Sequence, residues 1–133
     1  MKSALYWLAC ILCLTALFGC GESKAVVRGK VTFDGEIVKT GSITFIKVEG
    51  DPVRAGDVLR DGIYEVSLPP GNYKVEIFAN RVLGKKKIRY MDKEDEVEET
   101  EPLIPDWYNS KTKLTAEVKP GVTPLDFELS SKP

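Results

Sequence analysis

The 133 residues of this chain include no histidine. The side chains left for chemistry include carboxylates, amines, guanidinium groups, serines and three cysteines. The lack of histidine removes the commonest general base and the commonest metal ligand. Ser42, Ser67 and Ser110 therefore have no imidazole that could activate them as nucleophiles. A formal net charge of -1 gives no overall attraction to nucleic acid, so we expect no nucleic-acid partner.

Cys20 stands where an uncharged apolar run ends. Residues 4–18 carry no charge, and this run is shorter than the ~20 residues that a membrane-spanning helix needs. Gly19 and Cys20 follow, and the chain then turns polar. The arrangement resembles the lipobox of bacterial lipoproteins, which implies a signal peptide over residues 1–19, a lipidated Cys20 carrying palmitate-type chains, and a tether over residues 20–25. The alternatives are an uncleaved anchor or a signal cut at another position.

Cys10 and Cys13 have C-x-x-C spacing but lie inside the apolar run, so they would leave with the signal peptide. The spacing does not predict a redox or zinc site here, because there is no surrounding fold and no partner histidine. The mature chain would keep one cysteine, consumed by lipid, and form no disulfide. We expect no cofactor and no bound metal.

A charged segment interrupts the second half of the chain. Lys85, Lys86 and Lys87 form a basic run, and seven carboxylates lie between Asp92 and Glu101. Blocks of like charge repel themselves, which predicts a mobile, solvated loop over residues 84–106 of the folded domain. A calcium site is the alternative, but the spacing matches no EF-hand loop and lacks its glycine.

Trp107 and Tyr108 follow this charged segment directly. Two adjacent aromatic residues there could form an exposed platform for a ligand, or they could cap the open end of a β-sandwich. The sequence favours capping. The same pair nevertheless remains the candidate partner-binding site, together with Phe78 and Ile46 as further candidates for an exposed apolar patch.

From residue 25 onward the chain predicts short strands separated by turns, because apolar and polar residues alternate with a period of two. The clearest example is residues 61–77, predicted as two strands joined into a hairpin by the turn formers of residues 69–72. The inward positions of the alternating strands predict a core of Val31, Phe33, Ile43, Phe45, Tyr64, Val66, Leu68, Tyr73, Val75, Ile77, Leu114, Val118, Phe127 and Leu129.

Four stretches, residues 29–35, 61–64, 68–75 and 127–129, resemble carboxypeptidase-regulatory-like, transthyretin-like domains. Residues 104–115, after the charged segment, are similar to small bacterial lipoproteins that carry this domain. The resemblance implies an all-β, seven-stranded Greek-key β-sandwich of prealbumin type over residues 26–133. Fold alone does not give function.

The resemblance carries no enzyme activity to this chain. The transthyretin-related hydroxyisourate hydrolases rely on histidines and on a Tyr-Arg-Gly-Ser ending, and this chain has neither. The sequence therefore favours a membrane-anchored, non-catalytic binding or structural module of the bacterial cell envelope. We expect a protein, peptide or glycan partner there, facing the periplasm or the exterior. The alternative is an envelope enzyme with a carboxylate-only active site.

Overall fold

The computed structural model describes residues 23–133, so the predicted signal peptide and the predicted lipidation site at Cys20 lie outside the described residues. Within residues 23–133 no helix is long and apolar enough to cross a membrane. The elements of this part are β1 (Ala25–Phe33), β2 (Glu36–Ile37), β3 (Thr40–Lys47), β4 (Arg54–Arg60), β5 (Ile63–Leu68), β6 (Gly71–Phe78), β7 (Asn80–Tyr90), β8 (Lys93–Pro102), the 3-10 helix η1 (Asp106–Tyr108), β9 (Thr115–Val118), β10 (Val122–Pro124) and β11 (Phe127–Leu129).

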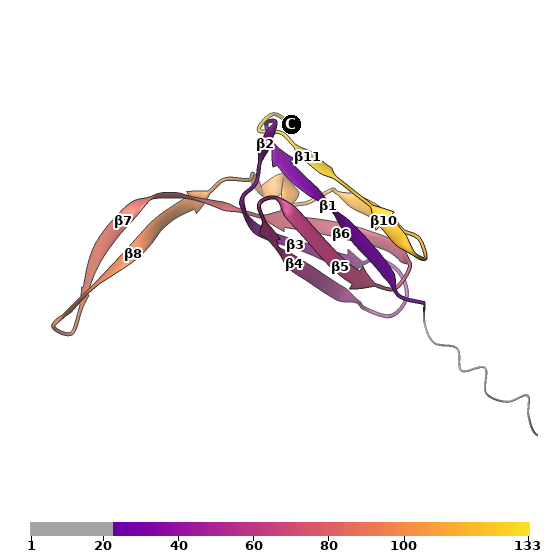
Figure 1. The fold of residues 1–133 in the computed structure, drawn as a ribbon, viewed down its shortest axis with the longest axis horizontal. Helices are drawn as coiled ribbons and strands as arrows, with labels where there is room; N and C mark the ends of the chain where they lie inside the picture. The colour runs from indigo at the N-terminus through magenta and orange to yellow at the C-terminus, as the bar shows by residue number, and fades with distance from the viewer. Residues whose placement is uncertain (1–22) are drawn as a thin grey trace, which may run out of the picture.

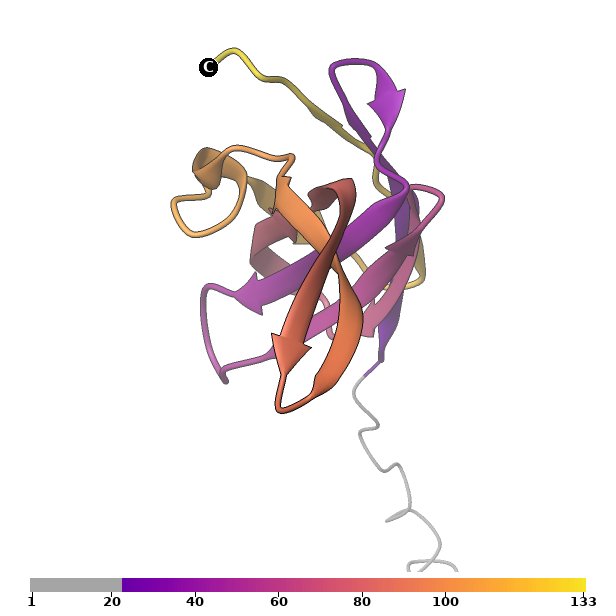
Figure 2. The same ribbon diagram turned by 90° about the vertical axis from the view of Figure 1, so that its left-hand side faces the viewer.

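Nine of these strands form one sheet that curls over, so that its two halves enclose the core (Figures 1 and 2). One half contains β10, β1 and β5, with β2 and β11 also paired to β1. The other half contains β4, β3, β6 and β9. The predicted all-β class is confirmed, and the curled sheet is consistent with a β-sandwich. The main sheet of the described part has nine strands rather than the predicted seven, because short strands at β2 and β10 also join it.

The predicted hairpin over residues 61–77 is wrong, although both of its strands exist. β5 pairs with β1, whereas β6 pairs with β3 and β9 in the other half of the sheet. The segment between β5 and β6 is therefore a crossover between the two halves. The tight turn instead precedes β5, where Asp61 and Gly62 both have positive φ, at 51° and 77°, and bring Arg60 opposite Ile63.

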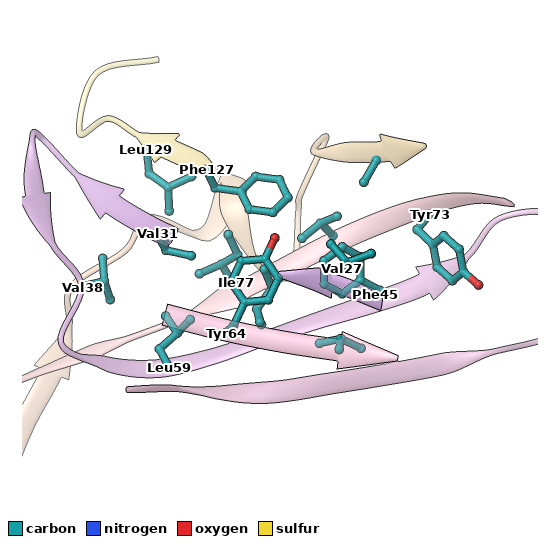
Figure 3. Packing of buried hydrophobic residues seen from close by; sticks show 14 of the residues in the cluster. Val27, Val31, Val38, Phe45, Leu59, Tyr64, Tyr73, Ile77, Phe127 and Leu129 are labelled. Atoms are coloured by element: carbon teal, nitrogen blue, oxygen red, sulfur yellow. The ribbon is translucent and has the colours of Figure 1, made fainter. Parts of the chain in front are cut away.

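The core lies between the two halves of the sheet and is largely the predicted one (Figure 3). Twelve of the fourteen predicted residues are buried, while Phe33 and Leu114 are partly buried against them. The rings of Phe45, Tyr64 and Phe127 meet at its centre, with centroids 6.0 to 6.4 Å apart. Further buried residues are Ala25, Val27, Val38, Leu59, Ala79, Ile104 and Ala116.

Gly29 lies where the segment between β10 and β11 runs closest beside β1. A Cβ atom at this position would lie 1.7 Å from the carbonyl oxygen of Leu125. The Leu125 amide also donates a hydrogen bond to the carbonyl of Arg28 at 3.0 Å, which holds the two backbones together. A glycine is required here because the two backbones approach too closely for a side chain.

The predicted charged loop over residues 84–106 is also wrong over most of its length. β7 and β8 form a separate two-stranded sheet that projects from the body of the molecule (Figure 1). This hairpin stands at the opposite end of the long axis from the start of β1 (Figure 1). The chain returns to the body after Pro102, where the Leu103 amide donates to the Ala79 carbonyl at 2.9 Å.

Candidate functional site

The projecting hairpin, residues 80–102, is the largest feature of the described chain that packs against nothing. Every residue of β7 is exposed, and β8 is nearly as exposed along its whole length. Its two strands are joined by Met91 and Asp92, whose positive φ values of 43° and 57° are those of a tight type I′ turn. The twist of such a turn matches that of the strands, so the register is fixed from the tip.

Charge explains why a segment with so many carboxylates pairs rather than stays a loop. β7 contains five cations and no anion, whereas β8 contains six anions and one cation, Lys93. The antiparallel register places Lys85 opposite Glu98, Lys87 opposite Glu96, and Arg89 opposite Glu94. Four of the six acidic residues of β8 therefore lie opposite a basic one, counting Arg81 opposite Glu101, and much of the repulsion expected within the acidic block is neutralised.

Three ion pairs connect the two strands. Arg89 contacts Glu94 at 3.3 Å, Lys85 contacts Glu96 at 3.7 Å, and Arg81 contacts Glu101 near the root. All of these side chains are exposed to solvent, where such pairs contribute little to stability. The three ion pairs therefore add little to the stability of the hairpin.

The two faces of the hairpin differ in the side chains they carry. Residues paired across antiparallel strands lie on the same face, so the register assigns each residue to one face. The charged face contains Lys85, Lys87, Arg89, Glu94, Glu96 and Glu98. The apolar face contains Ile88, Tyr90 and Val97, with Lys86, Lys93, Asp95 and Glu99 around them. Ile88 is 40% exposed, Tyr90 70% and Val97 38%, and Met91 at the tip is 80% exposed.

A cleft of about 380 Å³ lies where the hairpin meets the body. Its lining combines apolar and charged side chains from β2 and the hairpin root, including Glu36, Ile37, Lys39, Asn80, Arg81 and Leu103. A register irregularity between Val82 and Gly84 bends the hairpin above this cleft. The cleft is open and holds both signs of charge, so it favours no single ligand chemistry.

The predicted pair of aromatic residues lies on η1, against the body rather than on the hairpin. Trp107 and Tyr108 are both half-buried, with ring centroids 6.1 Å apart. The Tyr108 ring packs against the core, and its hydroxyl accepts a hydrogen bond from the Ser130 amide at 3.0 Å. Within the described residues the Trp107 Nε1 atom is buried without a hydrogen-bond partner. This geometry agrees with the capping interpretation and offers no flat exposed platform.

Phe78 and Ile46 do not join these aromatic residues in one patch. Phe78 lies opposite Ser42 and Ile46 lies opposite Lys74 on the β3–β6 pair. Phe78 is 44% exposed, and the residues between the two on this face are polar, such as Thr44 and Glu76. Sequence reasoning missed the apolar face of the hairpin, although the alternation of Ile88 and Tyr90 with Lys87 and Arg89 could have indicated it.

The carboxylates show no arrangement suited to acid catalysis at the two places where their pKa values shift. The Ser131 backbone amide donates to Asp34 and lowers the pKa of that carboxyl. A hydrogen bond from Lys111 lowers the pKa of Asp106. A catalytic general acid needs a raised pKa, so neither carboxyl fits that role. Across residues 23–133, no three carboxylate or thiol side chains gather closely enough to hold a metal ion.

Comparison with known proteins adds two distant structural neighbours. No family model and no curated protein sequence matches the chain. A DUF3823 family protein from Parabacteroides merdae is 15% identical with a TM-score of 0.41, over 81% of this chain and 46% of its own. A 9R-lipoxygenase from Cyanothece is 11% identical with a TM-score of 0.37, over 82% of this chain and 16% of its own. The chain thus spans less than half of either neighbour, and at these TM-scores neither bears on its function.

Proposed function

We propose that this protein is a lipid-anchored, non-catalytic binding module of the bacterial cell envelope, and that the projecting hairpin is its contact surface. The observation that carries the proposal is the exposure of the hairpin together with its sidedness. A two-stranded hairpin alone is marginally stable in water, and one with exposed apolar side chains on a single face is suited to a partner that covers that face.

The position of the hairpin fits an anchored module. If Cys20 carries lipid, the four residues between it and β1 reach at most about 14–18 Å when fully extended. The start of β1 would then face the membrane, and the hairpin would stand at the far end of the long axis (Figure 1). Its contacts would be made away from the lipid surface.

The proposal of a non-catalytic role rests on the available chemistry. The chain has no histidine, and its only cysteine outside the apolar run would be acylated. The alternative, an envelope enzyme with a carboxylate-only site, would need paired acids with pKa values pushed apart in a concave pocket. The open cleft at the hairpin root, with Glu36 and no second carboxylate in its lining, is a poor candidate for that.

We also propose that the β-sandwich is of the transthyretin-like, Greek-key type. The support is the resemblance of residues 29–35, 61–64 and 68–75 to carboxypeptidase-regulatory-like domains. The close approach of the Leu125 backbone to Gly29 and the tight turn at Asp61 and Gly62 give structural reasons for two of these stretches.

The experiment removes the hairpin without disturbing the body. Asn80 and Pro102 pair directly, so residues 81–101 can be replaced by an Asn-Gly turn. We expect the same melting temperature as the full chain and the loss of its crosslinks in native membranes, because the hairpin contributes surface but no core. A second variant, Cys20→Ser, should move the protein to the soluble fraction. Crosslinks that persist unchanged without the hairpin would refute the contact surface, and a membrane-bound Cys20→Ser protein would refute the anchor.

A further inference from the structure

We propose that the apolar face of the projecting hairpin packs against the same face of a second copy of this chain anchored in the same membrane. This inference rests on the proposed function and names the partner. The face to be covered is that of Ile88, Tyr90 and Val97, with Met91 at the tip.

Charge disfavours the competing way of pairing two hairpins, edge to edge. Two β7 edges would bring basic strands together, and two β8 edges would bring acidic strands together. Pairing β7 of one copy with β8 of another avoids the repulsion but leaves a free edge at each end, which leads to open filaments. Packing of the two apolar faces is closed and symmetric. That face carries two cations, Lys86 and Lys93, and two anions, Asp95 and Glu99.

The common anchor sets the direction of the pairing. Two copies in one membrane are related by a two-fold axis along the membrane normal, so hairpins that point away from the membrane run parallel. About such an axis, β7 of each copy lies across β8 of the other. Lys86 then faces the segment from Asp95 to Glu99 of the second copy, and the basic strand meets the acidic one. The antiparallel arrangement would place β7 over β7 and is disfavoured by charge.

The size of the face predicts a dimer that depends on the membrane. About ten residue pairs at ~3.4 Å each, on a ribbon roughly 10 Å wide, give about 340 Å² per copy, or about 700 Å² in total. This lies below the ~1,200 Å² of stable interfaces, so we expect the soluble protein to be mainly monomeric. Lipid anchoring confines the copies to one surface and raises their effective concentration.

The test uses variants of the full chain in which one residue of the hairpin is replaced by cysteine, expressed and kept in native membranes. Parallel pairing brings the two tips together, so mild oxidation of Met91→Cys should give a disulfide-linked dimer. Lys87→Cys, on the charged face, should stay monomeric. Adding Ile88→Asp to Met91→Cys should abolish the dimer, whereas adding Lys87→Asp, the same change on the opposite face, should preserve it. Met91→Cys combined with Cys20→Ser should give at least tenfold less dimer at equal protein concentration.

The outcomes separate this inference from the proposed function. A Met91→Cys protein that stays monomeric, or a Lys87→Cys protein that dimerises equally well, overturns the second-copy arrangement. If a photo-crosslinker at Tyr90 captures a different protein in place of a second copy, the inference fails while the contact surface stands. If Tyr90 captures nothing and crosslinks from the body are unchanged by removing the hairpin, both proposals fail.

Discussion

Tyr64 offers a sharp test of how the core is closed. Its side chain is 1% exposed, and its hydroxyl donates to the Leu125 carbonyl at 2.6 Å. Tyr64→Phe keeps the ring beside Phe45 and Phe127 but leaves that carbonyl without this donor. A buried acceptor that loses its partner destabilises the fold by about 1–3 kcal/mol. At about 4 °C per kcal/mol for a domain near 100 residues, we expect the melting temperature to fall by about 4–12 °C at pH 7.

The same substitution should change the response to alkaline pH. Burial, with a smaller contribution from the negative charge of Asp126, raises the pKa of Tyr64 well above its ordinary value of about 10. As pH rises through about 10, the unfolded chain therefore loses the Tyr64 proton before the folded one does. The stability due to this group is complete below that pH and declines above it by up to about 1.4 kcal/mol per pH unit. Tyr64→Phe removes this decline, so the stability gap between the two proteins should narrow above pH 10.

Denaturant unfolding at pH 7, 9, 10 and 11 measures both effects. Tyr73, whose pKa is also raised by burial, is present in both proteins and cancels from the difference. Tyr90→Phe is the matched control, because its side chain is 70% exposed and should leave stability unchanged. Equal stability of Tyr64→Phe and the unmodified protein at pH 7, or a gap that stays constant up to pH 11, would refute the reasoning.

Three further outcomes are expected. Phe127→Ala should destabilise the domain by about 3–5 kcal/mol in denaturant unfolding. Phe33→Ala should destabilise it by clearly less, because Phe33 is only partly buried. Equal losses of stability would contradict the packing described. In hydrogen exchange the amides of the projecting hairpin should be the least protected strand amides, with no change on adding millimolar calcium, because nothing packs on them; strong calcium-dependent protection would contradict this. Trp107→Ala should lower the melting temperature, but by less than Phe127→Ala, since the indole is half-buried; a loss as large as that of Phe127→Ala would place it in the core.

The core could be predicted because each of its strands buries one face, and a period of two then separates inside from outside. The pairing partners could not, because alternation within a strand says nothing about which strand lies beside it. Residues 61–77 illustrate this: both strands were predicted correctly, but the crossover at residues 69–70 carries β6 to the other half of the sheet. Several missed core residues, such as Val38 and Ile104, lie outside the strands and follow no period.

The projecting hairpin does not follow from repulsion within each charged block, which favours a loop, but from attraction between the two blocks. Lys85 and Glu98, Lys87 and Glu96, and Arg89 and Glu94 lie at equal distances from the turn at Met91 and Asp92. This mirror relation is visible in the sequence and indicates antiparallel pairing. Trp107 and Tyr108 were predicted as a pair, but their burial depends on the end of the body formed by η1 and the last residues, which no local pattern reveals.

The strand at the start of the domain finds some of its partners only at the end of the chain. β1 pairs in parallel with β10 and β11, and the Lys30 amide donates to Asp126 at 2.8 Å across 96 residues. Contacts between such distant parts of the chain form slowly, because closing a long loop costs entropy before the contact stabilises the fold. A chain still emerging from the ribosome lacks these partners until residues 122–129 arrive. Such a topology delays closure of the fold until β10 and β11 have been synthesised, although β1 is made first.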